Sequence, residues 1–374
     1  MKRMLPECLP LLWLATSLLC ACQNGEQPPK QQTAETPQPP DLSTSPQPST
    51  PPDTAPLYPP APELPPEPNT LHIAVISDIN GSYGSIGYGK NVTNAVRDIV
   101  QKKFDFVLSP GDLVAGQKAG LDYDAMWRAF HFNVGDVFFD NNMEFIMAPG
   151  NHDASAYPSF IGERYAYARA FRSRLPRAPL LPGSNFPFYY AVHLRDILVV
   201  ALDITRPISN SDPQLDWLES LLSNHTNERA TLVLGHLPLT PVNIAQFWET
   251  AGSSRLVELL QRHPRTLYIS GHHHIFYPGH IGELRTIACP ALGSGARSLF
   301  GESPVSGYVQ LTVPPHSPIR VTARVAPDFS RMIDIKKLPE MIISTQREDI
   351  GLSNYIIEMI DDSAKNTMIP GDQY

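Results

Sequence analysis

The sequence has few cysteines, no excess of positive charge and no hydrophobic run of the about 20 residues that a membrane-spanning helix needs. Four cysteines in 374 residues are too few for a scaffold held together by disulfides. Lysine and arginine number 29 against 37 aspartates and glutamates, so the net charge is -8 and a broad basic face for nucleic acid is excluded. We therefore expect a fold that depends on its hydrophobic core and binds no nucleic acid.

Proline, in contrast, is abundant and concentrated near the N-terminus. Sixteen of the 39 prolines fall between Pro28 and Pro68, among Gln, Ser and Thr and almost no large apolar side chains. Such a stretch cannot build a core, so residues 22–69 are predicted to be a disordered, Pro-rich tether. The remainder is long enough for one large domain, which we place at residues 70–325, followed by a C-terminal extension of unknown role at 326–374.

The first 21 residues have the pattern of an export signal. Lys2 and Arg3 precede an apolar run from Leu9 to Leu19, which has the length of a signal-peptide core. The run ends in Leu-Cys-Ala-Cys, which resembles the lipobox of bacterial lipoproteins with Cys22 as the lipidated residue. The alternative is an ordinary secretory signal with incidental cysteines.

The lipobox resemblance implies a location as well as a modification. Residues 1–21 would be a lipoprotein signal peptide that is cleaved, and Cys22 would anchor the exported protein to a membrane. Gln23 follows the anchor, and by analogy with other lipoproteins the lack of Asp there favours the outer membrane, with the protein facing the periplasm or the cell surface.

From Leu71 onward, short apolar runs alternate with amphipathic segments, a pattern that predicts an α/β layered sheet. Six buried strands are expected at residues 71–77, 104–109, 143–148, 197–202, 230–234 and 266–270, and helices at 91–103, 215–222 and 253–263. Runs at 284–289, 307–313 and 319–325 have no helix between them and predict an antiparallel continuation of the sheet. Two further short helices are expected at 332–343 and 352–360.

Polar residues follow five of these six strands. They are Asp78 and Asn80, then Asp112, then Asn151 to Asp153, then His236, and finally His272 to His274. Taken alone, an Asp or Asn after a strand is more often a turn or capping residue, and a histidine such as His236 is more often a partly exposed core residue. In open α/β sheets, however, the carboxyl ends of the strands are where ligands bind. Histidine, carboxylate and amide oxygen together form the mixed ligand set that suits Mn, Fe or Zn.

These residues also carry a family resemblance. Asp78-x-Asn80, Gly111-Asp112, Gly150-Asn-His-Asp153, Gly235-His236 and Gly271-His-x-His274 resemble, in order, the signature of the calcineurin-like metallophosphoesterases, which include the purple acid phosphatases. The resemblance implies a four-layer αββα sandwich with mixed sheets and a metal site at the C-terminal ends of the strands. It also implies two metal ions bridged by Asp112, the first bound by Asp78 and His274 and the second by Asn151, His236 and His272.

The resemblance further implies hydrolysis of a phosphate ester by a hydroxide that bridges the two metals. His152 would face the leaving-group oxygen, and Asp153 would orient the ring of His152 through its far nitrogen. We expect a small phosphate-ester substrate and a phosphomonoesterase. The alternatives are a phosphodiesterase acting on nucleotides or lipid head groups, and a lipoprotein that binds metal or phosphate without catalysis because its first metal site is degenerate.

Asn80 departs from the family pattern, which has histidine at this position. A neutral amide oxygen is a weaker ligand, so Asn80 is either a direct ligand of the first metal, a residue that contacts substrate or a ligand, or a plain turn residue. Purple acid phosphatases replace this histidine by a tyrosine shortly after the second motif, and residues 111–115 contain none.

Several other residues near the motifs receive weaker predictions. His273 is expected to face away from the metals, because neighbouring residues in a strand point to opposite sides. The glycine-rich loop at residues 81–89 is either a plain surface loop or a lid that places Tyr83 or Tyr88 over the substrate. Four aromatic residues in apolar helical patterns are expected in the core, namely Trp127, Tyr165, Tyr167 and Trp217. The sequence specifies neither the substrate-binding residues nor the oligomeric state.

Overall fold

The computed structural model describes residues 67–243, 246, 249–299 and 304–338, together with the backbone of 342–347 and 354–359. The signal peptide, Cys22 and the tether up to residue 66 lie outside the described residues, so these predictions stay predictions. Within the described part, every helix is too short or too polar to cross a membrane.

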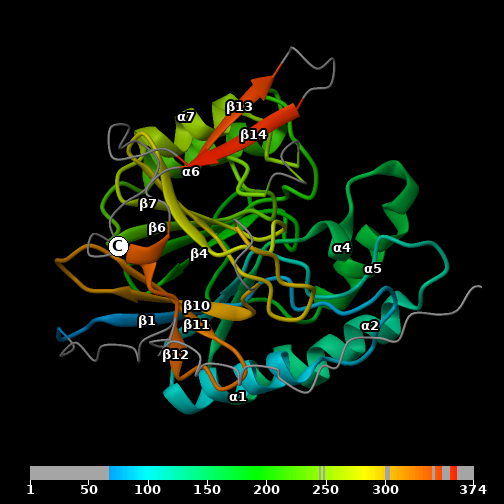
Figure 1. The fold of residues 1–374 in the computed structure, drawn as a ribbon. Coiled ribbons are helices and arrows are strands. Elements are labelled where there is room, and N and C mark those ends of the chain that lie inside the picture. Colours follow the sequence, from blue (N-terminus) through cyan, green and yellow to red (C-terminus); the bar gives the residue numbers. More distant parts are fainter. Residues whose placement is uncertain are drawn as a thin grey trace, which may run out of the picture. The chain divides into compact units, whose positions relative to one another are not determined.

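Two six-stranded mixed sheets form the centre of the fold (Figure 1). The first sheet has the order β12-β11-β10-β1-β2-β3, with β1, β2 and β3 parallel and the other neighbours antiparallel. Its strands are β1 (Leu71–Val75), β2 (Phe106–Ser109), β3 (Glu144–Met147), β10 (Gly307–Val313), β11 (Arg320–Val325) and β12 (Arg331–Met332).

The second sheet has the order β4-β5-β6-β7-β9-β8. The four inner strands β5, β6, β7 and β9 are parallel, and the edge strands β4 and β8 are antiparallel to their neighbours. Its strands are β4 (Tyr190–Leu194), β5 (Ile197–Ala201), β6 (Ala230–Leu234), β7 (Thr266–Ser270), β8 (Tyr277–Ile281) and β9 (Leu284–Ala288).

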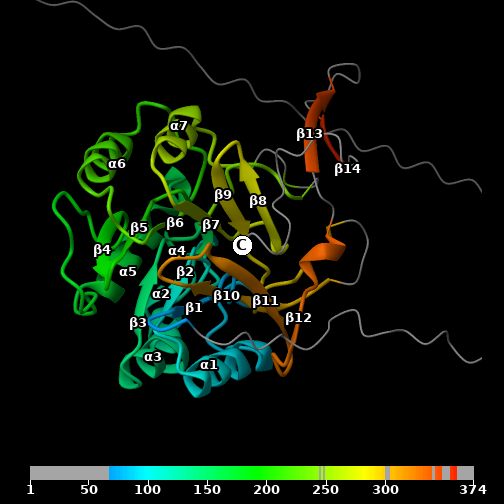
Figure 2. The ribbon, with the colours of Figure 1, turned by 90° about the vertical axis from the view of Figure 1, so that its left-hand side faces the viewer.

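Helices cover the outer face of each sheet (Figure 2). The first sheet packs against α1 (Lys90–Lys102), α2 (Tyr123–Phe130), α3 (Asp136–Asp140) and α5 (Ile161–Phe171), and the second against α6 (Pro213–Asn224) and α7 (Ser254–Arg262). A π-helical turn at His131–Gly135 links α2 to α3, the one-turn helix α4 (Asn151–Ala154) follows β3, and 3₁₀ turns lie at Pro158–Phe160 and Ile335–Lys337. The layers are therefore α, β, β and α, and the predicted four-layer sandwich with mixed sheets is confirmed.

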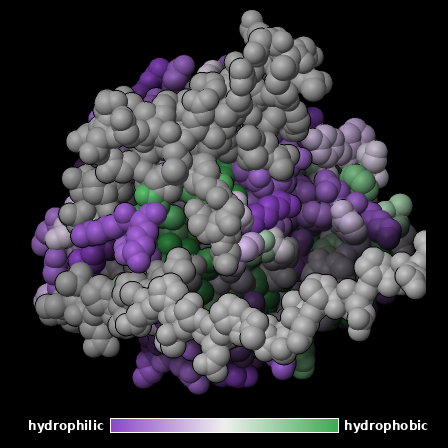
Figure 3. Space-filling view, viewed as in Figure 1, coloured by the Kyte–Doolittle hydropathy of each residue, from purple (hydrophilic) through white to green (hydrophobic). Residues whose placement is uncertain are grey.

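Three apolar cores hold these layers together. The inner core lies between the sheets and takes residues from both, such as Ile73, Leu108, Val199 and Leu232. The other two cores lie between each sheet and its helices. In Figure 3, apolar residues show at the centre of the face, where the two sheets meet in Figure 1, and hydrophilic ones lie to the sides. Because the strands are covered on both faces, they read as continuous apolar runs in the sequence.

Local signals fix the ends of the helices that position the site. Asp212 caps α6 by accepting a hydrogen bond from the Gln214 N–H, and Pro213 occupies the first helical position. The predicted Ser253 cap of α7 accepts from the Leu256 N–H. Both helices present leucines to the sheet, which fixes the strands whose ends carry His236 and His272.

Some sequence predictions were wrong. The run at 284–289 forms β9, which is parallel to β7 in the second sheet, whereas only β10 and β11 continue antiparallel in the first. The helices expected at 332–343 and 352–360 are replaced by a 3₁₀ turn and by a hairpin of β13 (Ile342–Arg347) and β14 (Asn354–Met359). Trp127 and Tyr167 are buried as expected, but Tyr165 is 65% exposed and Trp217 is only partly buried.

Candidate metal centre

The two sheets bring the polar strand ends together at one edge. Asp78 follows β1, Asp112 follows β2 and Asn151 opens α4 after β3, while His236 follows β6 and His272 and His274 follow β7. Single donor atoms of Asp78, Asp112 and His236 all lie within 4.8 Å of one another, and all three side chains are buried. The structure thus gathers residues that are up to 196 positions apart into one cluster.

Around His236 the ring nitrogens have defined roles. Its Nδ1 donates to the Pro110 carbonyl oxygen over 3.0 Å, so its Nε2 points to the cluster, 2.8 Å from Asn151 Oδ1 and 3.4 Å from Asp112 Oδ1. Complete burial lowers the pKa of His236. The neutral ring, protonated at Nδ1, therefore offers a free Nε2 lone pair.

The ring of His272 is held in the same way as that of His236, but the roles of its two nitrogens are exchanged. Its Nε2 donates to Glu249 Oε2 over 2.6 Å, which leaves Nδ1 facing Asn151 Oδ1 at 3.0 Å and His236 Nε2 at 3.2 Å. The amide of Asn151 is held by Gln117, whose Oε1 accepts from Asn151 Nδ2 over 3.0 Å. This bond turns the Oδ1 of Asn151 toward the two histidines.

Three lone pairs therefore point at one another from Asn151 Oδ1, His236 Nε2 and His272 Nδ1. The two rings already donate their other nitrogen to a carbonyl and a carboxylate, so in the neutral rings no proton is left to bridge the group. A cation at this point would accept all three lone pairs. The residues fit a metal ion with mixed nitrogen and oxygen ligands.

A second group of ligand atoms surrounds Asp78. His274 Nδ1 donates to the Gly295 carbonyl oxygen over 2.8 Å, and its Nε2 lies 3.1 Å from Asp78 Oδ1. Burial raises the pKa of Asp78, but the charge and hydrogen bond of His274 outweigh that effect and hold the pKa below its usual value. Asp78 is therefore present as a carboxylate, the form that binds metals.

Asn80 lies beside this group with an unsatisfied oxygen. Its side chain is 5% exposed and its Oδ1 has no hydrogen-bond partner among the described residues, whereas its N–H donates to the Asp112 carbonyl oxygen. A buried acceptor without a donor costs free energy unless something else binds it. This favours the interpretation of Asn80 as a direct ligand over that of a plain turn residue.

His152 and Asp153 are both close to the cluster, but not in the predicted relation. The His152 ring donates from Nδ1 to the Gly116 carbonyl oxygen over 3.0 Å, and its backbone N–H donates to Asp112 Oδ1. Burial lowers the pKa of His152, but the Asp112 carboxylate and the Gly116 carbonyl outweigh it, so the pKa is raised overall. A carbonyl, not a carboxylate, therefore sets the tautomer of His152.

The predicted role of Asp153 in orienting His152 was wrong. Both of its oxygens are occupied by backbone N–H groups, those of Leu113 and Val114 at Oδ1 and those of Asp112 and Gly150 at Oδ2. Burial raises the pKa of Asp153 and these N–H bonds oppose the rise, because they favour the charged form. Asp153 fixes the loop that carries Asp112 and does not touch the ring.

Two glycines of the signature are required by close approach. A Cβ at Gly150 would lie 2.2 Å from both the N and the Oδ1 of Asp112, and a Cβ at Gly271 would lie 2.5 Å from Asp78 Oδ2. Real Cβ atoms do not come so close, so any larger residue would push a carboxylate out of the cluster. Gly150 thus allows two neighbouring strand ends of the first sheet to approach each other, and Gly271 allows the end of β7 in the second sheet to approach Asp78 in the first.

A comparison with known families agrees with this geometry. The model of the calcineurin-like phosphoesterases matches residues 71–276, more than half of the chain. The chain belongs to this family. The family is metal-dependent, and its members are phosphoesterases acting on small phosphate esters. No curated protein matches the chain.

Solved structures resemble this chain at low identity. A purple acid phosphatase from yellow lupin (Lupinus luteus) seeds is 17% identical with a TM-score of 0.50, and the match covers 68% of this chain but 51% of that one. A dimetal phosphatase from Danio rerio is 14% identical with a TM-score of 0.46, covering 71% and 96%. GAP50, the anchor in the inner membrane complex of Plasmodium, is 19% identical with a TM-score of 0.48, covering 68% and 84%.

In this phosphoesterase the ring nitrogens of His273 bond to the backbone and not to the ligand cluster, which agrees with the prediction that His273 faces away from the metals but has a different reason. His272 and His274 have φ values of 66° and 59°, so the segment is not a strand and its residues do not alternate. His273 accepts from the Val242 N–H at Nδ1 and donates from Nε2 to the Gln246 carbonyl oxygen. Burial lowers its pKa to about 3, so a neutral His273 holds the segment that leads to Glu249.

A cavity of about 490 Å³ opens beside the ligand group that contains Asn151 and His272. Asn151, His152, His272, Glu249 and Arg206 are among the residues that line it. The exposed Tyr83 lies next to it, with its ring centroid 5.6 Å from that of His152, whereas Tyr88 points inward and donates to the Leu113 carbonyl oxygen. Of the two tyrosines in the glycine-rich loop, Tyr83 is the one placed to contact a bound substrate.

Glu249 and Gln117 are site residues that the sequence did not reveal. Each binds a ligand side chain rather than the cluster itself, Glu249 through His272 and Gln117 through Asn151. Neither belongs to the strand-end motifs, and both lie in loops. The left-handed φ of 64° at Gln117 and its N–H bond to Glu163 hold it in place, and neither feature has a sequence signal of its own.

Replacing Glu249 is expected to weaken metal binding without unfolding the protein. Glu249→Ala would free the Nε2 proton of His272 and let the ring adopt the other tautomer, so we expect a loss of about 10–100-fold in affinity for one metal ion. Glu249→Gln keeps an acceptor for this proton and should lose less. Metal titration of both variants measures the effect, and Glu258→Gln, on the exposed face of α7, is the control. Unchanged affinity in Glu249→Ala would show that the contact does not support His272.

Proposed function

We propose that this phosphoesterase hydrolyses small phosphate monoesters with two metal ions of the Mn, Fe or Zn type. The observation that carries the proposal is the presence of two groups of metal-ligand side chains on either side of Asp112. One group contains Asp78, Asn80 and His274, and the other contains Asn151, His236 and His272. Asp112, with its carboxylate between them, is the residue suited to bind both ions.

The residues of this chain would have separate roles in the hydrolysis. Metal ions held by these two ligand groups would neutralise the phosphate and supply an activated water at neutral pH. His152, fixed at Nδ1 by the Gly116 carbonyl, offers Nε2–H to the leaving-group oxygen from the wall of the cavity. Asp153 keeps Asp112 in position through the bond from the Asp112 N–H.

The charges around the cavity favour a monoester over a diester. A monoester carries up to two negative charges and a diester one. The lining residue Arg206 supplies positive charge next to the ligands, and, despite burial, the Asp112 carboxylate raises the pKa of His152, which favours its charged form. Glu249, the carboxylate in the same wall, is already bonded to His272. A phosphodiesterase acting on nucleotides or lipid head groups is the second candidate, because one side of the cavity is open to the exposed Tyr83 and Arg206.

The test is hydrolysis of p-nitrophenyl phosphate and bis(p-nitrophenyl) phosphate by the full chain after loading with Mn, Fe or Zn. We expect metal-dependent release of p-nitrophenol, faster from the monoester, and none from Asp112→Asn. Faster turnover of the diester would replace the proposal by a phosphodiesterase. If no metal gives turnover of either ester, the chain is a non-catalytic protein that binds metal or phosphate.

A further inference from the structure

A second cluster of metal-ligand type lies far from the strand ends that carry the catalytic centre. It consists of His193 on β4, His225 directly after α6, and Glu228 in the loop that leads to β6. Glu228 precedes β6 and His236 follows it, so the five residues of this strand, at about 3.3 Å each, separate the two clusters by roughly 16 Å. The cluster therefore shares no residue with the catalytic centre.

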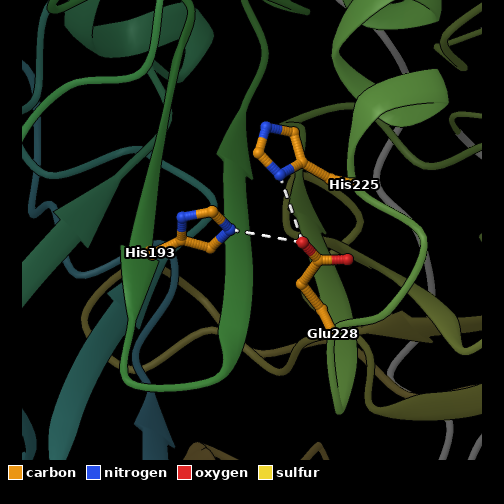
Figure 4. A group of neighbouring side chains, drawn as sticks. All are labelled: His193, His225 and Glu228. Carbon is orange, nitrogen blue, oxygen red and sulfur yellow. Dashed lines mark hydrogen bonds and ion pairs between the residues drawn. The ribbon is translucent and has the colours of Figure 1, made fainter.

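The three side chains converge on one point (Figure 4). His193 Nε2 lies 3.4 Å and His225 Nδ1 3.1 Å from the same oxygen, Glu228 Oε1, and the ring centroids are 4.9 Å apart. Ligands bound tetrahedrally to zinc at 2.0–2.1 Å are separated from one another by about 3.3–3.4 Å. The two distances to Glu228 Oε1 thus already match the ligand spacing of one ion, and all three donor atoms lie within 4.8 Å of one another.

The other oxygen of Glu228 indicates that the cluster is incomplete as it stands. Glu228 Oε2 is buried and has no hydrogen-bond partner within the described part of the chain. The side chain as a whole is 13% exposed. Arg229, the next residue, pairs with Asp196 and not with Glu228. A buried carboxylate oxygen of this kind is costly unless it binds a donor or a cation.

The backbone around the cluster is held firmly. His263 Nε2 donates to the His225 carbonyl oxygen, and its Nδ1 bonds to Thr266 Oγ1. The Arg229 N–H donates to the Asp196 carbonyl oxygen, and His193 is paired in register with Leu198 across β4 and β5. These bonds fix the backbone at all three residues. Binding an ion would therefore cost little conformational entropy of the chain.

We propose that His193, His225 and Glu228 bind one Zn²⁺ ion at a site separate from the catalytic centre. Two imidazoles and one carboxylate are a ligand set of zinc, whereas Mg²⁺ and Ca²⁺ prefer oxygen ligands alone. The side chain of His193 is 37% exposed, which leaves room for water as a fourth ligand. The ion cross-links the edge strand β4 to the connection between α6 and β6.

Counting zinc in the full chain tests the proposal. After incubation with Zn²⁺ and removal of free ions, His193→Ala and His225→Ala are each expected to contain about one zinc per chain less than the wild type. His316→Ala, at an exposed loop position, is the control and keeps the full count. Equal zinc contents in wild type and both cluster variants would overturn the proposal.

A second measurement uses only the wild-type protein, so its result does not depend on whether the variants fold. Diethyl pyrocarbonate modifies accessible imidazole nitrogens, and mass spectrometry locates the modified residues. Zn²⁺ is expected to protect His193 and His225 of the wild-type protein at least about fivefold, an effect that EDTA reverses. Modification of both residues at the same rate with and without Zn²⁺ would overturn the proposal even if the variants fail to fold.

Discussion

Asp112→Asn is expected to lose at least about 10³-fold in the rate of phosphate-ester hydrolysis, or about 4 kcal/mol. The substitution keeps the shape of the side chain and leaves the Asp112 N–H free to bond with Asp153. It removes the negative charge that lies 3.4 Å from His236 Nε2 and between the two ligand groups. The metal ions then lose their shared ligand, and metal content is expected to fall along with activity.

The stability of this variant separates loss of metal from loss of fold. Without metal, Asp112 is a buried charge whose field raises the pKa of Asp153, so neutralising it should not lower the melting temperature of the metal-free protein. With metal, the wild type should melt at a higher temperature, because only the folded state binds the ions, and Asp112→Asn should lose most of this rise.

Asp105→Asn is the matched control for Asp112→Asn. Asp105 lies just before β2, at the opposite end of the strand that Asp112 follows, and accepts from the His72 N–H. We expect this variant to keep both activity and the metal-induced rise in melting temperature. Full activity in Asp112→Asn would show that Asp112 does not bind the catalytic ions.

The cluster could be predicted from the sequence because its residues follow buried strands directly. The carboxyl ends of parallel strands share one edge, so polar residues after β1, β2, β3, β6 and β7 are brought together by the fold. The two sheets face each other across one core, and this places His236 between Asp112 and His272. The layers themselves follow from the same alternation of apolar strands and amphipathic helices.

What the sequence could not supply were contacts made by loops. Glu249 reaches His272 because His273 bonds to the backbone of residues 242 and 246, a contact between segments about 30 positions apart. Asp153 was predicted to bind the ring of His152. Its carboxylate instead accepts hydrogen bonds from four backbone N–H groups that lie closer to it. Which group binds the carboxylate depends on positions in the folded chain, and these leave no periodic pattern in the sequence.

The edge strands β4 and β8 and the C-terminal hairpin were not predicted, for a related reason. β4 and β8 are antiparallel edge strands, and β8 includes Pro278 and Gly279, which weaken any strand pattern. The segments 342–347 and 354–359 pair with each other as a hairpin. Their short apolar runs fit a helix or a strand equally well, so the pairing partner decides between the two.

His152→Ala is expected to lower kcat by about 10²–10⁴-fold for esters with poor leaving groups while leaving metal content unchanged. The ring would be lost, but the bond that His152 makes to a ligand, from its backbone N–H to Asp112 Oδ1, remains in alanine. If His152 donates a proton to the leaving oxygen, p-nitrophenyl phosphate should lose much less than phenyl phosphate, because p-nitrophenolate leaves without a proton. Steady-state kinetics with both esters, together with metal analysis, measure the difference.

His72→Ala provides the control for this variant, because His72 lies in β1 at the end away from Asp78 and is half-buried. We expect it to retain wild-type kcat for both esters. An equal loss for phenyl and p-nitrophenyl phosphate in His152→Ala would mean that the ring stabilises charge on the phosphate rather than protonating the leaving group. No loss for either ester would refute the role of His152, and leaving-group protonation would then have to come from solvent at the open side of the cavity.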